Sequence, residues 1–136
     1  MDFRVDPEFQ LKLDWMNKFV REEIEPIDLL FPSASAMYDV NNKKARAAIK
    51  PLRDKVKAQG LWACHLPPEL GGKGYGQLKL GLMNEIIGRC SWAPTIFGCA
   101  APDTGNAEIL ALFGTPAQKQ RYQPGKWPIK KEKVCK

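Results

Sequence analysis

Apolar residues recur at steps of three and four along the first part of the chain. The first set lies within residues 7–26 and consists of Phe9, Leu13, Met16, Val20 and Ile24. The second set lies in a segment that ends before Gly60 and consists of Ala45, Ala48 or Ile49, Leu52 and Val56. This spacing puts each set on one face of an amphipathic α-helix. Asp6 can cap the first helix and Pro7 fits its first turn.

Prolines and polar residues mark the expected interruptions. Pro26 closes the first helix, and we expect residues 27–42 to form a loop. The apolar residues Leu29, Leu30 and Phe31 begin this loop, and we expect them to pack against the first helix. Pro51 lies inside the second helical pattern, where a proline lacks the N–H that the helix needs. Pro51 therefore either kinks one helix or is the first residue of a second, and we expect a break there.

The second half of the chain repeats the helical pattern in shorter segments. Leu78–Cys90 predicts a helix, and its two glycines, Gly81 and Gly88, favour a central buried position where another backbone approaches closely. Asn106–Phe113 predicts a short helix with Ile109, Leu110 and Phe113 facing inward and Gly114 following its end. Thr115 and Gln118 have the spacing of a capping box, with Pro116 at the first helical position.

Together these segments predict an all-α fold, a bundle of five to six helices over residues 1–122. An irregular tail, residues 123–136, follows, and we expect it to be disordered. At 136 residues, with 44% hydrophobic and 26% charged residues, the chain has the composition of one globular domain. No apolar stretch has the length of a membrane span, and the N-terminus has no features of a secretory or mitochondrial signal.

The charge and the cysteines narrow the classes of function. The net charge is +6, and residues 121–136 hold six basic residues against one acidic residue, so the tail carries +5 and the domain +1. The four cysteines form no Cys-x-x-Cys pair and there is one histidine, which disfavours a metal site. We expect reduced thiols and an intracellular location, with cytoplasm, mitochondrion and peroxisome not distinguished.

A glycine-rich stretch, residues 60–76, joins the two halves of the chain. Four glycines at positions 71, 72, 74 and 76 indicate a tightly folded loop whose backbone lies close to another group. The spacing fits neither nucleotide-binding pattern, because Gln77 stands where a dinucleotide loop needs its third glycine and where a P-loop needs lysine. A structural loop between two helices is the favoured interpretation. His65, within this stretch, has no partner at catalytic spacing, and we expect a packed or half-exposed side chain.

Two motifs resemble a known family. The first is Gly-Leu-Trp at residues 60–62 with Leu-Pro-Pro-Glu-Leu-Gly-Gly-Lys-Gly-Tyr-Gly at residues 66–76, followed by Met-Asn-Glu-Ile-Ile-Gly-Arg-Cys at residues 83–90. The second is Asn-Ala-Glu-Ile-Leu at residues 106–110 with Phe-Gly-Thr-Pro-Ala-Gln-Lys-Gln-Arg-Tyr at residues 113–122. In this order they resemble the N-terminal helical domain of the acyl-CoA dehydrogenase family. The stretch between them, residues 101–106, is similar to a subgroup found in bacteria and fused to other domains in animals.

The resemblance implies a part of a flavoenzyme. Complete family members remove hydrogens from the α and β carbons of acyl-CoA thioesters in fatty-acid oxidation, with FAD held mainly by a β-domain and a C-terminal helical domain. The resemblance ends near residue 122, as in a truncated form, so we expect no catalytic residue and no stably bound FAD in this chain. It implies weak acyl-tunnel contacts at Thr95, Phe97, Gly98, Cys99, Ala101 and Pro102. Flavin-contacting residues are not predicted.

Two other classes of function stay open. A truncated, non-enzymatic chain could act as an interaction module that associates with full-length family members, because it would expose the apolar surface that the β-domain covers. The basic tail could instead bind anions. Nucleic-acid binding ranks last, since no recognised motif or aromatic-lined groove accompanies the basic residues.

Overall fold

The fold is seen in a computed structural model that describes residues 5–31, 33–37, 39, 41–68, 72–101 and 103–122. The predicted all-α class is confirmed, since these residues contain helices and no strand. Pro102 and the tail, residues 123–136, lie outside the described residues. The α-helices are α1 (Pro7–Phe19), α2 (Ile27–Leu30), α3 (Lys43–Ala58), α4 (Gly76–Ile87), α5 (Ala93–Ile96), α6 (Asp103–Phe113) and α7 (Pro116–Tyr122).

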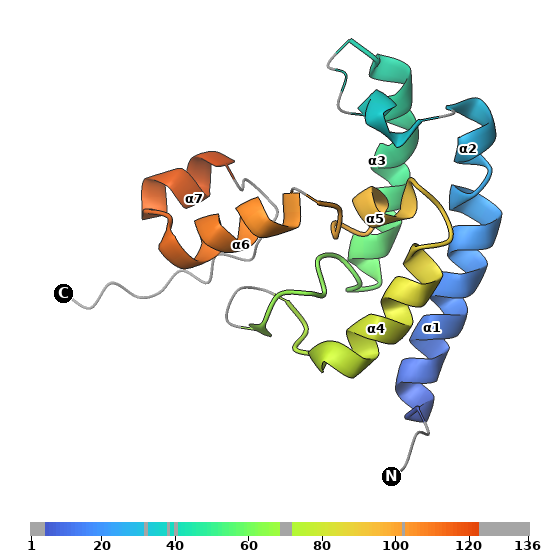
Figure 1. The fold of residues 1–136 in the computed structure, drawn as a ribbon, viewed down its shortest axis with the longest axis horizontal. Coiled ribbons are helices and arrows are strands. Elements are labelled where there is room, and N and C mark those ends of the chain that lie inside the picture. The colour runs from blue at the N-terminus through green and yellow to red at the C-terminus, as the bar shows by residue number, and fades with distance from the viewer. Residues whose placement is uncertain are drawn as a thin grey trace.

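The helices form a bundle and a separate hairpin (Figure 1). α1 and α4 lie side by side, and α3 packs against the short helix α5 (Figure 1). α6 and α7 pack on one another and extend away from the bundle (Figure 1). The glycine-rich loop between α3 and α4 and the segment from α5 to α6 therefore both lie near the point where the hairpin leaves the bundle.

The N-terminal helix follows its predicted pattern. The Asp6 carboxylate accepts a hydrogen bond from the Phe9 N–H at 2.8 Å, which confirms the N-cap. α1 continues as a π-helical turn, Val20–Ile24, that ends with a hydrogen bond from the Glu25 N–H to the Val20 carbonyl. All five residues of the apolar face are buried, namely Phe9, Leu13, Met16, Val20 and Ile24. The π-turn keeps the last two of them on the core side of the helix.

The expectation for residues 27–42 is wrong in two respects. The segment contains α2 and a 3₁₀-helical turn, Ala34–Met37, instead of a simple loop. Leu29 and Leu30 are 87% and 71% exposed, so they do not pack against α1. The chain turns at Pro26, and this turn directs Ile27 into the core and leaves the next two leucines on the solvent side. Phe31 is half-buried, with its ring centroid 5.8 Å from that of Trp92.

The expected break at Pro51 is also wrong. α3 is one helix with Pro51 in its interior. Pro51 removes one hydrogen bond, which would run to the carbonyl of Ala47. Both residues are exposed, so water can satisfy that carbonyl, and the buried face of α3 packs without interruption. That face consists of Ala45, Ile49, Leu52 and Val56, as the periodicity predicted.

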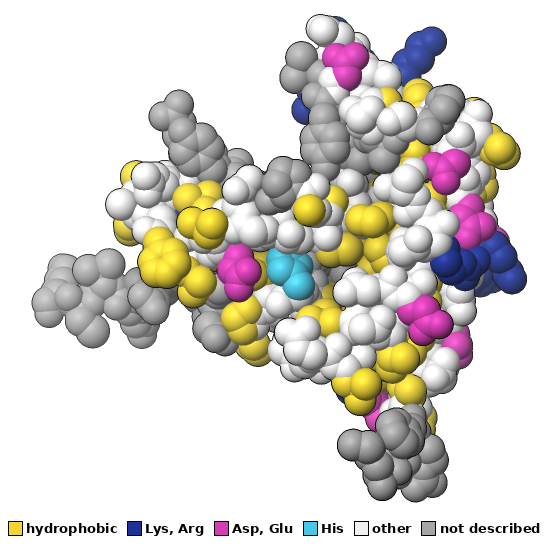
Figure 2. Space-filling model, in the orientation of Figure 1, with side chains coloured by type: hydrophobic (Ala, Val, Ile, Leu, Met, Phe, Trp, Pro, Cys, Tyr) yellow, Lys and Arg dark blue, Asp and Glu magenta, His cyan; other side chains and the backbone are white. Residues whose placement is uncertain are grey.

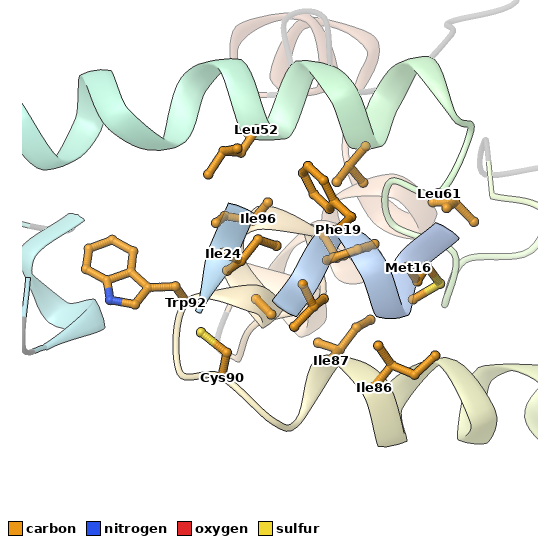
Figure 3. Packing of buried hydrophobic residues seen from close by; sticks show 14 of the residues in the cluster. Met16, Phe19, Ile24, Leu52, Leu61, Ile86, Ile87, Cys90, Trp92 and Ile96 are labelled. Carbon is orange, nitrogen blue, oxygen red and sulfur yellow. The ribbon is translucent and has the colours of Figure 1, made fainter. Parts of the chain in front are cut away.

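The core lies between the first helix, α3, α4 and α5. Figure 3 shows Phe19 and Ile24 from the N-terminal helix facing Leu52 of α3 and Ile96 of α5, with Ile86 and Ile87 of α4 on the opposite side. Trp92 is completely buried at one end of this cluster. Burial of such apolar side chains is the main force that holds the bundle together.

α4 differs from the central buried helix that its glycines suggested. It buries Met83, Ile86 and Ile87, but Leu78 is 77% exposed. A side chain at Gly81 would meet no atom within 4 Å, so no backbone approaches there. Gly88 is the C-cap of the helix, where its nearest neighbour is the carbonyl of Asn84 in the same helix. The glycines therefore do not mark a helix–helix contact.

The α6–α7 hairpin combines one correct and one wrong expectation. The capping box is confirmed, because the Thr115 N–H donates to the Gln118 side chain at 2.8 Å and the Gln118 N–H donates to the Thr115 hydroxyl at 3.3 Å. The inward orientation of Ile109 and Phe113 is wrong, since they are 61% and 81% exposed. On another face of α6, Ala111 is buried.

Candidate functional site

A cavity of about 430 Å³ lies where the α6–α7 hairpin meets the bundle. Its apolar wall comes from α4, the start of the glycine-rich stretch and the segment after α5, and consists of Leu61, Leu80, Met83, Ile87 and Phe97. Its other lining residues are Cys64, His65, Gln77, Asn84, Cys99, Thr104, Gly105 and Glu108. Figure 2 shows the chain's one histidine, in cyan, on the face where the hairpin joins the bundle. The volume is within the range of small-molecule pockets.

Two helix faces that the sequence analysis did not select line this cavity. α4 contributes Gln77, Leu80, Asn84 and Ile87, which recur at steps of three and four. α6 contributes Thr104 and Glu108, four residues apart. Residues at these spacings share one side of a helix. A search for mixed polar and apolar faces, in addition to purely apolar ones, could have identified both.

The predicted acyl-contact residues take different positions. Phe97 and Cys99 line the cavity. Thr95 is buried, and its carbonyl accepts a hydrogen bond from the Arg53 side chain at 3.4 Å. Gly98 faces the ring of Trp62, and Ala101 is exposed at the start of the connection to α6. The structure thus brings two of the predicted residues together at one cavity wall.

The end of α5 fixes that wall. Gly98 has φ of 71°, and the Cys99 N–H donates to the Pro94 carbonyl at 2.8 Å while the Gly98 N–H donates to the Thr95 carbonyl at 3.3 Å. This pair of bonds is a Schellman motif, which reverses the chain after a helix. The Phe97 carbonyl also accepts a hydrogen bond from the Ala63 N–H at 2.9 Å. The two chain segments that carry Cys64 and Cys99 are held together in this way.

His65 is half-buried, and both of its ring nitrogens are shielded from solvent without a hydrogen-bond partner. Burial lowers the pKa of the imidazole, and the nearby Glu108 carboxylate acts in the opposite direction. The neutral ring has one donor and one acceptor nitrogen. An unpaired buried polar atom costs about 1–3 kcal/mol. His65 is therefore the least satisfied polar group of the described cavity lining.

The cavity thiols are poor nucleophiles. Burial raises the pKa of Cys64 to about 12 and that of Cys99 to about 11. Both are free thiols, as is Cys90, whose pKa is also raised by burial. The thiolate is the reactive form, so these environments work against nucleophilic catalysis by cysteine.

We expect alkylation of Cys64 and Cys99 by iodoacetamide at pH 8 to be at least about a hundredfold slower in the folded chain than in guanidinium. Because their pKa values are raised, the folded-state rates should keep rising about tenfold per pH unit at alkaline pH, after the rates of the unfolded chain have levelled off. Peptide mapping by mass spectrometry would assign each rate. Equal rates in the folded and unfolded chain would contradict the burial of these thiols.

The described part of the glycine-rich loop makes close contacts with its own backbone. The Gly72 N–H donates to the Pro67 carbonyl at 3.0 Å, and a side chain at Gly72 would overlap the Leu66 carbonyl. Gly74 and Gly76 have φ of 64° and 76°, which explains the need for glycine there. The close backbone contact predicted for this loop is thus with its own backbone, and the structural interpretation is supported.

Two further kinds of site were sought in the described part of the chain. It contains no group of three or more His, Cys, Asp or Glu side chains that could hold a metal ion. None of its helices has the length and hydropathy needed to cross a lipid bilayer.

Comparison with known proteins supports the resemblance. The model of the acyl-CoA dehydrogenase N-terminal domain matches residues 6–126. Acyl-CoA dehydrogenase family member 11 from Rattus norvegicus is 33% identical over 112 residues, covering 79% of this chain and 14% of the relative. The probable acyl-CoA dehydrogenase IBR3 from Arabidopsis thaliana is 30% identical over 130 residues, covering 74% of this chain and 15% of the relative. Probable acyl-CoA dehydrogenase FadE2 from Mycobacterium tuberculosis is 37% identical over 97 residues, covering 65% of this chain and 23% of the relative.

These relatives are much longer than this chain, which spans 14% to 23% of their length. No solved structure gives a significant match. The family match nevertheless covers most of the chain and includes α1 to α7. The chain therefore belongs to the acyl-CoA dehydrogenase family, and its matched residues correspond to the N-terminal domain of that family.

Proposed function

We propose that this chain serves as the N-terminal α-domain of a flavin-dependent acyl-CoA dehydrogenase and provides one wall of the acyl tunnel beside the flavin. The observation that carries the proposal is the cavity at the α6 junction, where Phe97 and Cys99 meet an apolar face of α4. The family match and the names of the relatives support it. An aliphatic chain would lose water-exposed area against such a wall, which favours its binding.

We further propose that residues 1–136 alone do not carry out the dehydrogenation. The glycine-rich loop is the place in the sequence that most resembles a phosphate site, and in its described part the Gly72 N–H already donates to the Pro67 carbonyl, which works against binding of the FAD pyrophosphate there. Thr95, Gly98, Ala101 and Pro102 remain proposed acyl contacts of a complete enzyme. The flavin and the catalytic base are proposed to lie on segments beyond this domain.

The proposal can be tested with the chain and with a chimera. The purified chain, mixed with FAD and a series of acyl-CoA thioesters, should stay colourless and reduce no electron acceptor. In the chimera, residues 6–122 replace the matching segment of the Mycobacterium tuberculosis relative, and we expect bound flavin and acyl-CoA-dependent reduction of the acceptor. A folded chimera with flavin but without any response to acyl-CoA would contradict the proposed role in the tunnel.

A second candidate function has its own supporting observation. α6 exposes Ile109, Leu112 and Phe113, which are 61%, 53% and 81% exposed and share one side of the helix. A groove along the hairpin, lined in part by Leu110 and Gln118, continues this surface. Exposed apolar surface of this kind is typical of an interface. It favours the interaction module, whose partners would be full-length family members or a second copy of the chain.

Replacing Ile109 and Phe113 together by serine should weaken self-association of the chain by about tenfold or more, because the change removes the apolar centre of this surface. Sedimentation equilibrium would measure the association constant. The matched control replaces Leu29 and Leu30 of α2 by serine. These two leucines are also exposed, at 87% and 71%, but they lie outside the hairpin. Equal association of both double variants would exclude the hairpin as the interface.

A further inference from the structure

We propose that the cavity at the α6 junction is a binding site for an uncharged aliphatic ligand with a hydroxyl group, and that His65 hydrogen-bonds this hydroxyl. This proposal rests on the cavity of this chain alone. It adds a recognition group to the apolar wall used in the proposed function, and it can hold whether or not that wall belongs to an acyl tunnel.

The first step concerns the unsatisfied imidazole. Nδ1 and Nε2 of His65 are both shielded and unpaired, although the residue itself is half-buried and lines the cavity. The exposed part of His65 therefore does not include its ring nitrogens. A half-turn of the ring about χ2 exchanges the positions of Nδ1 and Cδ2 and those of Nε2 and Cε1. No hydrogen bond holds the present orientation, so a ligand that pairs with a nitrogen can select the turned one.

The second step concerns the shape and chemistry of the remaining lining. Leu61, Leu80, Met83, Ile87 and Phe97 provide a wall for a flexible hydrocarbon chain. The polar lining is mostly uncharged and includes Gln77, Asn84 and Thr104. An apolar pocket with a few placed polar groups is the usual architecture for binding one small, mostly apolar molecule.

The third step concerns charge. Glu108 is an exposed carboxylate at the cavity, and it is close enough to act on the pKa of His65. The described lining contains no lysine or arginine. Lys73 lies outside this lining but close enough to act on the pKa of Cys64. Beside His65, a ligand carboxylate would meet the like charge of Glu108, whereas a hydroxyl can donate to or accept from the neutral imidazole. A neutral alcohol therefore fits better than a fatty acid.

The probe that tests this is 1-octanol, with octane, octanoate and octylamine as comparisons. The chain has one histidine, so its two imidazole nitrogen signals in a ¹⁵N NMR spectrum need no further assignment. We expect 1-octanol to shift one of them strongly, octane to leave both nearly unchanged, and octanoate to bind more weakly. No binding of 1-octanol, or binding without a change at the imidazole nitrogens, would overturn the proposal.

The variant His65→Phe keeps a ring and removes both nitrogens. Its affinity for 1-octanol should fall about fivefold, the loss expected for one neutral hydrogen bond, while its melting temperature should stay equal or rise because two unpaired polar atoms are gone. Gln10→Ala, an exposed polar change on α1 outside the cavity lining, is the control and should keep the wild-type affinity. Equal affinity in His65→Phe and wild type, or tighter binding of octylamine through Glu108, would also overturn it.

Discussion

Replacing Trp92 by alanine should lower the free energy of unfolding by about 3–5 kcal/mol, as is typical for truncation of a buried aromatic residue. Trp92 is 0% exposed and is among the largest fully buried side chains. Its indole N–H donates to the Phe31 carbonyl at 3.2 Å, and the two rings lie 5.8 Å apart. Truncation would therefore leave a cavity and also an unpaired carbonyl in the part of the chain after α2.

Urea denaturation followed by far-UV circular dichroism would measure the loss. Trp92→Phe is the matched variant, since it keeps a ring in the core but removes the indole donor. We expect its free energy of unfolding to fall by less than half as much as that of Trp92→Ala. Domains are stable by about 5–15 kcal/mol, so the alanine variant can be close to unfolding at room temperature. A loss below about 1 kcal/mol in Trp92→Ala would show that this tryptophan does not organise the core.

The position of Trp92 explains why its role in the core is not predictable from the local sequence pattern. The apolar faces of α1 and α3 were predictable, because regular spacing in a helix directly specifies which side is buried. Trp92 lies between α4 and α5, where no periodicity applies. Its contacts come from Phe31, 61 residues earlier in the chain. Local pattern contains no information on such long-range pairing.

The errors of the sequence analysis have a common physical origin. Leu29, Leu30, Ile109 and Phe113 were assigned to the core because they are apolar, yet all four are exposed. Apolar residues are not always buried, and short helices can turn either face to a neighbour. Pro51 was expected to break α3 because the local rule ignores that a lost hydrogen bond on a solvated face is inexpensive. At each of these positions, tertiary packing determines whether the side chain is buried or the helix continues.

Only two of the cavity-lining residues are among the acyl contacts expected from the sequence. Phe97 and Cys99 were selected by resemblance, and the structure does place both at the cavity. His65 was expected to be packed or half-exposed but was not predicted as a cavity residue, since the lining residues Gln77, Asn84 and Glu108 come from α4 and α6. Their meeting depends on how the hairpin packs against the bundle. Only the fold itself contains that information.

Replacing Gly98 by alanine tests the backbone that shapes this wall, and we expect it to cost about 2–5 kcal/mol. Two effects contribute. Gly98 has φ of 71°, a left-handed conformation that costs a residue with a Cβ about 1–2 kcal/mol. A Cβ at this position would also lie 2.6 Å from the Trp62 ring, which must move, and such overpacking typically costs about 1–3 kcal/mol. The ring is held by the cations Arg53 and Lys57, at 5.8 Å and 4.8 Å from its centroid.

The same substitution at Gly81 provides the matched control with the opposite sign. Gly81 lies in the interior of α4, where an added Cβ meets nothing within 4 Å. Gly81→Ala should stabilise the chain by about 0.5–1 kcal/mol, because alanine loses less conformational entropy than glycine in a helix. Urea denaturation would measure both changes. If Gly98→Ala were neutral, the tight contact with Trp62 would be refuted; if it is costly, the turn that holds Phe97 and Cys99 at the cavity is set by this glycine.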